Sequence, residues 1–418
     1  MALVLIKGAE GTGSEAGTPT ASSINPTQKV LQVDEKIHLL DEDNNPLVVF
    51  LKKTSTKSVR GPIFRWQEDR FEPKSVTIDA TASAALDDGT TATFSLPAGQ
   101  ENYLTVGDLL LFSGTAGVSP NQYDEIVLIT VVASNGLDIT CVRNFGSRNA
   151  AWAGTPANAA FTGYINGSAF EEGSLSADAK AVKTSFVSNY TQIFKDSISV
   201  TGTEDATELY GGNERGRQRR KKSLKHMRDM ERAFIVGQPK EDVTTGSYAR
   251  RSTGGILYFI STNVTDVSVG GVPGNINYAS WVNFAKAAFR YGDSKTRLLL
   301  CSAEVVSAIA LMAHNQYFAM TPEKTYGVST NRITTPYGDF LVVYHKQFSE
   351  MGLSGYAISL DMADVAYRPL AGRDTKLSLD VQANDADLHK DQLLTECGLS
   401  APLEERQAVL KGVGGFAP

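Results

Sequence analysis

Cysteine is scarce in this sequence, with three residues among 418, at positions 141, 301 and 397. They are too few and too widely spaced for a disulfide framework, a zinc knuckle or a C-x-x-C redox pair. No apolar run approaches the roughly 18 residues that cross a bilayer. The opening MALVLIK is shorter than the core of an export signal and lacks a basic leader. We therefore expect a soluble protein, made in a reducing cytoplasm.

Familiar catalytic and metal-binding motifs are also missing. The five histidines show no H-E-x-x-H or other ligand spacing, and there is no G-x-S-x-G nucleophile elbow. The glycine-rich stretch at 8–13 lacks the G-K-[ST] ending of a phosphate-binding loop, so we interpret it as low complexity. These absences predict a protein that is not an enzyme and holds no metal or cofactor.

The overall charge excludes one further class. Forty basic residues against 46 acidic ones leave a net charge of −6, which argues against binding to nucleic acid or membranes through global charge. Any such binding must be local. The length corresponds to roughly two to three domains, and 37 glycines against 15 prolines favour turns and β structure.

The N-terminal region is poor in core-forming residues. Residues 8–28 are mostly Gly, Ala, Ser, Thr and Pro and hold a single branched aliphatic, Ile24. Such a stretch is either a tail or an arm that becomes ordered only by lying on something else. Short extended segments are predicted at 29–40 and 47–53.

A β-rich module is predicted between residues 75 and 170. Its strand-like runs are at 91–96, 106–112, 125–133 and 137–142. Asn135-Gly136 is typical of a two-residue hairpin turn between the last two runs. The module has eight acidic residues against Arg143 and Arg148, so it carries all six net negative charges of the chain. Extended patterns around Trp66 and at 189–201 flank it, which is the layout of an insertion.

A long helix is predicted after this module. Thr201 and Glu204 fit a capping box, and helix-forming residues continue to Val236. The helix carries a local basic patch: Arg215, Arg217, Arg219, Arg220, Lys221, Lys222, Lys225 and Arg228. Such a patch faces phosphates, faces solvent, or pairs with acids elsewhere, including those of the β module in another subunit.

The second half of the chain has an α+β pattern. Residues 278–291 show an amphipathic helical spacing, and 297–301, 304–314 and 340–344 read as strand, helix and strand, with Ser302 as N-cap. Tyr337-Gly338 predicts a hairpin turn. Further strands are predicted at 356–360, 365–368 and 377–381.

Five blocks of sequence give a resemblance to a known family. They are 64–70 (FRWQEDR), 191–194 with 199–203 (TQIF and SVTGT), 251–255 (RSTGG), 335–340 (TPYGDF) and 360–365 (LDMADV). With the order of elements, they resemble the major capsid proteins of tailed bacteriophages with the Hong Kong 97-like fold, in a family whose extended loop carries a β-domain insertion.

The resemblance implies a division of the chain. Residues 1–60 would be an N-terminal arm, 61–74 with 171–200 the limbs of the extended loop, and 75–170 the β insertion. Residues 201–277 would form the peripheral domain with its spine helix, 278–345 the axial domain, and 346–418 the return strands and C-terminus. The contacts of the extended loop would involve Phe64, Trp66, Ile193 and Phe194.

The resemblance also implies a function. Copies of the chain would form hexamers and pentamers of an icosahedral shell that encloses double-stranded DNA in the virion, assembled in the cytoplasm of a host bacterium. The basic helix would face neighbouring subunits or packaged DNA. Further partners would be portal, separate scaffolding and decoration proteins, with no membrane. A cellular nanocompartment shell, another virion protein and a hydrolase stay open as alternatives.

Overall fold

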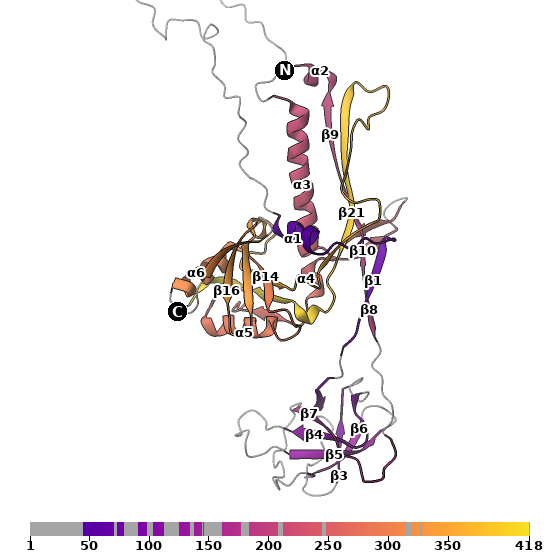
Figure 1. Ribbon diagram of the computed structural model, residues 1–418, viewed down its shortest axis with the longest axis vertical. Helices are drawn as coiled ribbons and strands as arrows, with labels where there is room; N and C mark the ends of the chain where they lie inside the picture. Colours follow the sequence, from indigo (N-terminus) through magenta and orange to yellow (C-terminus); the bar gives the residue numbers. More distant parts are fainter. Residues whose placement is uncertain are drawn as a thin grey trace, which may run out of the picture. The chain divides into compact units, whose positions relative to one another are not determined.

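The computed structural model describes the chain in segments: 45–70, 73–78, 91–97, 103–112, 125–133, 138–143, 145, 161–176, 184–207, 212–244, 248–314, 320–325 and 328–417. These residues form two compact units. Unit 1 comprises the described residues up to Phe64 and from Ser188 onward, and unit 2 comprises those between Arg65 and Val187 (Figure 1).

Unit 2 contains the predicted β-rich module. Its strands are β2 (Ser75–Ile78), β3 (Thr91–Ser95), β4 (Asp108–Phe112), β5 (Glu125–Val132), β6 (Asp138–Val142) and β7 (Phe161–Ser168). They form one antiparallel sheet in the order β2-β7-β4-β5-β6-β3. Alternate residues of the strands fill its core, where Phe94 and Phe112 meet edge to face. The predicted Asn135-Gly136 turn lies outside the described residues, although β5 and β6 pair as a hairpin requires.

Strands β1 (Ile63–Glu68) and β8 (Ser185–Tyr190) pair as a two-stranded sheet. Along β1, exposed and buried side chains alternate, as the sequence pattern predicts. Directly after β8 comes β9 (Gln192–Thr201), which belongs to a second sheet.

That second sheet is built around the longest strand of the described chain, β21 (Leu388–Ser400). It pairs with β9 over ten residues, and with β19 (Ala366–Pro369) and β20 (Lys376–Ser378). Helix α3 (Glu214–Val236), preceded by the short α2 (Gly202–Ala206), runs alongside β9 and β21 (Figure 1).

The remaining part of unit 1 is a mixed seven-stranded sheet in the order β12-β22-β18-β14-β17-β16-β15. The strands are β12 (Val264–Asp266), β14 (Thr296–Cys301), β15 (Met320–Thr325), β16 (Val328–Thr334), β17 (Asp339–Tyr344), β18 (Ala357–Leu360) and β22 (Ala408–Lys411). Helices α5 (Tyr278–Ala288) and α6 (Ala303–His314) contribute to a core with one face of this sheet. Its other face contributes to the core that contains α1 and α3.

The predicted strand–helix–strand unit is confirmed by β14, α6 and β17, because β14 and β17 pair in parallel. Ser302 caps α6, with its Oγ 3.5 Å from the amide of Val305. The turn at Tyr337-Gly338 is also confirmed, since β16 and β17 pair in antiparallel fashion around it. Strand β14 is buried on both faces, which explains its unbroken apolar run.

Shorter elements complete unit 1. They are β10 (Lys240–Asp242), β11 (Arg250–Ser252), α4 (Ile256–Phe259), β13 (Gly274–Ile276), β23 (Val413–Phe416) and two single 3-10 turns, Lys346–Phe348 and Glu404–Arg406. The predicted strands near 356–360, 365–368 and 377–381 correspond to β18, β19 and β20.

One segment has a different secondary structure from the one predicted. Residues 47–53, predicted to be extended, form helix α1 (Pro46–Thr54). The adjacent Val48 and Val49 favour a strand, yet Pro46 is well placed at the start of a helix and Leu47, Val48, Phe50 and Leu51 are buried in the main core. Packing therefore outweighs the local preference. The other predicted extended segment, 29–40, lies outside the described residues.

Candidate functional site: the basic helix and its strand ribbon

Helix α3 has an N-cap residue, Asn213, and is followed by Gly237, a position that has no space for a side chain. Asn213 Oδ1 accepts a hydrogen bond from the amide of Gly216 at 2.8 Å, which satisfies one of the free N–H groups of the first turn. After the last residue, a Cβ at Gly237 would lie 2.3 Å from the Ala233 carbonyl oxygen and 2.4 Å from that of Thr253. Glycine is therefore required at the end of the helix, because two backbone oxygens lie too close to this position for any Cβ atom.

The capping box predicted at Thr201 belongs to the separate helix α2. Thr201 Oγ1 accepts from the amide of Glu204 at 3.3 Å. Residues 208–211, between the two helices, lie outside the described residues. The predicted long helix is confirmed from Glu214 onward, but its predicted start at Thr201 is wrong, because α2 ends at Ala206 and Gly212 has a φ of 74°, outside the helical region.

Two of the predicted basic residues are held by one buried carboxylate. Asp391, on β21, has a fully buried side chain. Arg215 donates to its two oxygens at 2.5 and 2.9 Å, and Arg219 donates to one of them at 2.7 Å. This arrangement fastens the N-terminal half of α3 to the strand ribbon of β9 and β21, where few apolar side chains are available.

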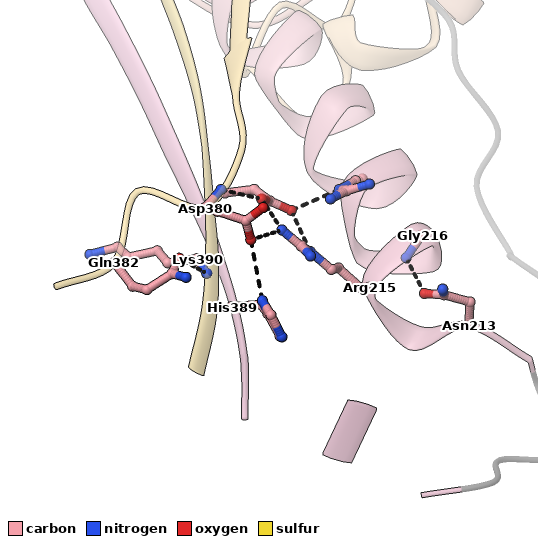
Figure 2. Close-up of polar contacts among 9 residues, drawn as sticks. Asn213, Arg215, Gly216, Asp380, Gln382, His389 and Lys390 are labelled. Atoms are coloured by element: carbon pink, nitrogen blue, oxygen red, sulfur yellow. Dashed lines mark hydrogen bonds and ion pairs between the residues drawn. The ribbon is translucent and has the colours of Figure 1, made fainter. Parts of the chain in front are cut away.

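A second carboxylate joins the same cluster. Asp380 Oδ1 accepts from Arg215 at 2.6 Å and lies 3.2 Å from His389 Nδ1 (Figure 2). Its backbone has a φ of 52°, in the left-handed region that few residues other than glycine adopt. Its amide donates to Asp391 at 3.2 Å. Figure 2 shows Arg215 reaching from the helix toward Asp380, in the loop between β20 and β21.

The charges shift each other's protonation equilibria. Hydrogen bonds from Arg215, and then from Arg219, hold the pKa of Asp391 well below its usual range, although burial acts in the opposite direction. The same contact with Asp391 raises the pKa of Arg215. The Arg215–Asp391 pair is therefore charged at neutral pH.

Further along the helix, His226 is fully buried between two strand residues. Its Nδ1 lies 2.9 Å from Asp196 Oδ2 on β9, and its Nε2 lies 2.8 Å from Thr395 Oγ1 on β21. Burial opposes ionisation of Asp196, but hydrogen bonds from His226 and Lys225 outweigh it and lower the pKa of Asp196. The helix is thus tied to both strands of the ribbon.

The remaining basic residues of the predicted patch differ in whether they form a salt bridge. Arg217 pairs with Glu214 at 2.5 Å and Lys225 with Asp196 and Asp229 at 2.9 and 2.7 Å. Arg228 is half-buried. Arg220 and Lys221 are exposed and Lys222 is half-buried, and none of these three forms a salt bridge within the part of the chain that the structure describes.

The four aromatic and aliphatic residues predicted for strand contacts differ in their burial. Phe64 and Phe194 are buried in unit 1, where the Phe64 ring lies against Gly398 and Phe194 meets His226 edge to face. In unit 2, Trp66 is buried and donates to Glu68 Oε1 at 2.9 Å. Ile193 alone of the four is half-exposed, with 51% of its surface accessible.

One functional candidate is not apparent in the sequence. Glu231, fully buried in α3, accepts from the amides of Leu47 and Val48 at 2.8 and 2.7 Å, and lies 2.9 Å from His345 Nε2. No local pattern signals it, because a lone glutamate on a charged helix resembles any solvated residue.

Among the described residues, no group of three or more His, Cys, Asp or Glu side chains has an arrangement that fits a metal ion. No helix in the same segments is long and apolar enough to span a membrane.

Comparisons with known proteins give the family. A family model described as the SU10 major capsid protein matches residues 12–414. The major capsid protein of Pseudomonas phage PaMx41 is 26% identical over 254 residues, which are 58% of this chain. The chain spans 59% of the length of that relative, less than two thirds.

Two solved capsid structures are similar to this chain at low identity. The capsid of a native GTA particle has 9% identity and a TM-score of 0.48, covering 95% of this chain and 100% of that chain. The capsid of cyanophage A-1(L) has 8% identity and a TM-score of 0.48, covering 93% and 98%. The family model matches nearly the whole sequence, so the chain belongs to the SU10 major capsid protein family, and the predicted membership of a phage major capsid family is confirmed.

Proposed function

We propose that this protein forms the head shell of a tailed bacteriophage. Its copies would assemble into hexamers and pentamers of an icosahedral shell with the Hong Kong 97-like fold, around a double-stranded DNA genome. The observation that carries the proposal is the family match over residues 12–414. Because that family is one of phage capsid proteins, a cellular nanocompartment shell has less support.

The architecture supports a structural role. The predicted division into arm, extended-loop limbs, β insertion, peripheral domain, axial domain and return strands assigns α3 to the peripheral domain, α5, β14 and α6 to the axial domain, and β21 to the return strands. A shell protein needs elements that neighbours complete, such as a strand ribbon and an arm, rather than a catalytic cluster. We infer that the protein is not an enzyme.

The basic helix would serve contacts with other molecules through only some of its residues. Arg215, Arg219 and Lys225 already have carboxylate partners in their own subunit. We therefore assign contact with packaged DNA, or with an acidic surface of a neighbouring subunit, to Arg220, Lys221 and Lys222. Contact with DNA would be non-specific, because lysine and arginine bind backbone phosphates without reading the bases.

The remaining parts of the proposal follow from the family. The protein would reside in the virion, after assembly in the cytoplasm of the host bacterium. Its partners during assembly and in the virion would be portal, scaffolding and decoration proteins, besides further copies of the chain.

Sedimentation of the full-length protein tests the proposal. A shell protein sediments as rings or megadalton particles, and electron microscopy of those fractions would show closed icosahedral shells. A single small oligomer under all assembly conditions would contradict the proposal.

A further inference from the structure

Helix α1 has no cap of its own. Its N-cap residue, Asn45, makes no capping hydrogen bond with its side chain, and Asn45 Oδ1 instead accepts from Gln347 Nε2 at 2.8 Å. Pro46, at the first position, has no N–H. The ladder of the helix begins only at the amide of Val49, which donates to the Asn45 carbonyl at 3.2 Å. Two amides, those of Leu47 and Val48, therefore need an outside acceptor.

Glu231 supplies that acceptor from another helix. Each of its two oxygens accepts one of these amides, at 2.8 and 2.7 Å. The carboxylate also lies where the partial positive charge of a helix N-terminus favours an anion. Pro46 has no N–H to satisfy. The Glu231 carboxylate accepts from the amides of Leu47 and Val48, and the Asn45 carbonyl accepts from that of Val49, so every backbone donor at the start of α1 has a partner.

A second residue fixes the carboxylate. His345 Nε2 lies 2.9 Å from Glu231 Oε1, and its ring stacks on Phe348 at 4.5 Å between centroids. Both His345 and Glu231 have fully buried side chains. His345 therefore fixes the position of the acceptor in the folded subunit.

The chain after α1 is held as firmly as its start. The amide of Lys57 donates to the Tyr367 carbonyl at 2.9 Å, the amide of Tyr367 to Ser55 at 2.9 Å, and the amide of Val59 to Pro369 at 2.8 Å. Residues 45–60 of the predicted arm are therefore integrated into unit 1, against α3 and β19.

We propose that Glu231, positioned by His345, is the anchor that fixes where the N-terminal arm leaves the subunit. This inference rests on the proposed shell function, in which the arm meets neighbouring copies. A helix of nine residues is unstable alone, so α1 depends on this cap and on its buried face. Loss of the anchor would free the first turn of α1, which directly follows the arm, and would remove the fixed point from which the arm reaches its neighbour.

Substitution of Glu231 by glutamine tests the anchor. One amide oxygen remains, but the NH2 group would face an N–H donor, so one backbone donor of α1 becomes buried without a partner. Hydrogen exchange of the full-length chain should show amides of residues 47–54 exchanging on the order of tenfold to a hundredfold faster. The amides of α5, in the other core, should be unchanged. The yield of closed shells should fall.

The control is Asp229→Asn on the same helix, which removes a half-exposed carboxylate paired with Lys225. It should leave exchange in α1 and shell yield at the wild-type level. If E231Q unfolds throughout, E231D keeps the charge with a shorter reach and should give the same local effect more weakly.

Two outcomes would overturn the anchor. One is wild-type exchange in α1 of E231Q or E231D, and the other is a loosened α1 with a normal yield of shells. Failure of the wild-type chain to form shells would instead contradict the proposed function, and the exchange of α1 would still report on the cap.

Discussion

Arg215 and Asp391 lie 176 positions apart in the sequence, yet the guanidinium of one donates to both oxygens of the other, at 2.9 and 2.5 Å. A bidentate pair of this kind fixes both distance and orientation. The acid is fully buried and the arginine side chain is 15% exposed. The pair therefore links the first turns of α3 to β21 at a place where the apolar core does not reach.

Replacement of Asp391 by asparagine should destabilise the subunit on the order of 3 kcal/mol, because removal of one partner of a buried ion pair leaves the other without compensation. In this variant Arg219 loses its carboxylate partner, and Arg215 keeps only the exposed Asp380. Thermal unfolding would measure the effect. Arg217→Ala is the control, since its pair with Glu214 is on the surface, and it should change the unfolding temperature little.

The stability conferred by Asp391 should depend on pH in a defined direction. Its pKa in the folded protein is lowered, chiefly by Arg215, whereas the unfolded chain has the ordinary value of about 3.9. A lowered folded-state pKa gives stability that is complete above the unfolded pKa and is lost as pH falls toward the folded one. The difference in unfolding temperature between wild type and D391N should be constant from about pH 7 to 5 and shrink below about pH 4. A difference that grows below pH 4 would contradict this.

Local patterns predicted the elements whose stability is local or periodic. The apolar stripe of Trp281, Phe284, Ala285 and Ala288 indicates α5 because it recurs at helical spacing, and the structure buries those residues. Helix α1 was predicted wrongly because its cap, Glu231, lies 184 residues away from Leu47.

For the candidate site too, local sequence patterns do not reveal contacts with distant residues. The basic patch predicts a charged surface helix, and its residues do lie on α3. Nothing in the sequence distinguishes Arg215 and Arg219 from Arg220 and Lys221, because the distinction depends on Asp391, contributed by a distant strand. Periodicity identifies a helix but not the partner of each face.

Charge reversal should separate the structural and the contact-forming basic residues. The triple variant of Arg220, Lys221 and Lys222 to Glu breaks no salt bridge among the described residues, so its unfolding temperature should stay close to that of the wild type. Its shells should be absent, misassembled or poorly filled, as seen by sedimentation and electron microscopy.

The single variant Arg219→Glu is the matched comparison. It brings a carboxylate toward buried Asp391, so it should lower the unfolding temperature clearly. Normal, filled shells from the triple variant would remove these three residues from the contact surface.

Substitution by alanine should have opposite effects on stability at Gly216, in the first turn of α3, and at Gly237, directly after its last residue. At Gly237 a Cβ would lie 2.3 and 2.4 Å from two backbone oxygens, so Gly237→Ala forces the helix end away from Thr253 and should cost about 1–3 kcal/mol or more. At Gly216 the nearest atom would be 3.6 Å away, and alanine should add about 0.5–1 kcal/mol because it restricts the unfolded chain and favours the helix. Urea unfolding followed by circular dichroism would measure both. Equal effects of the two substitutions would show that the close approach at Gly237 does not determine where α3 ends.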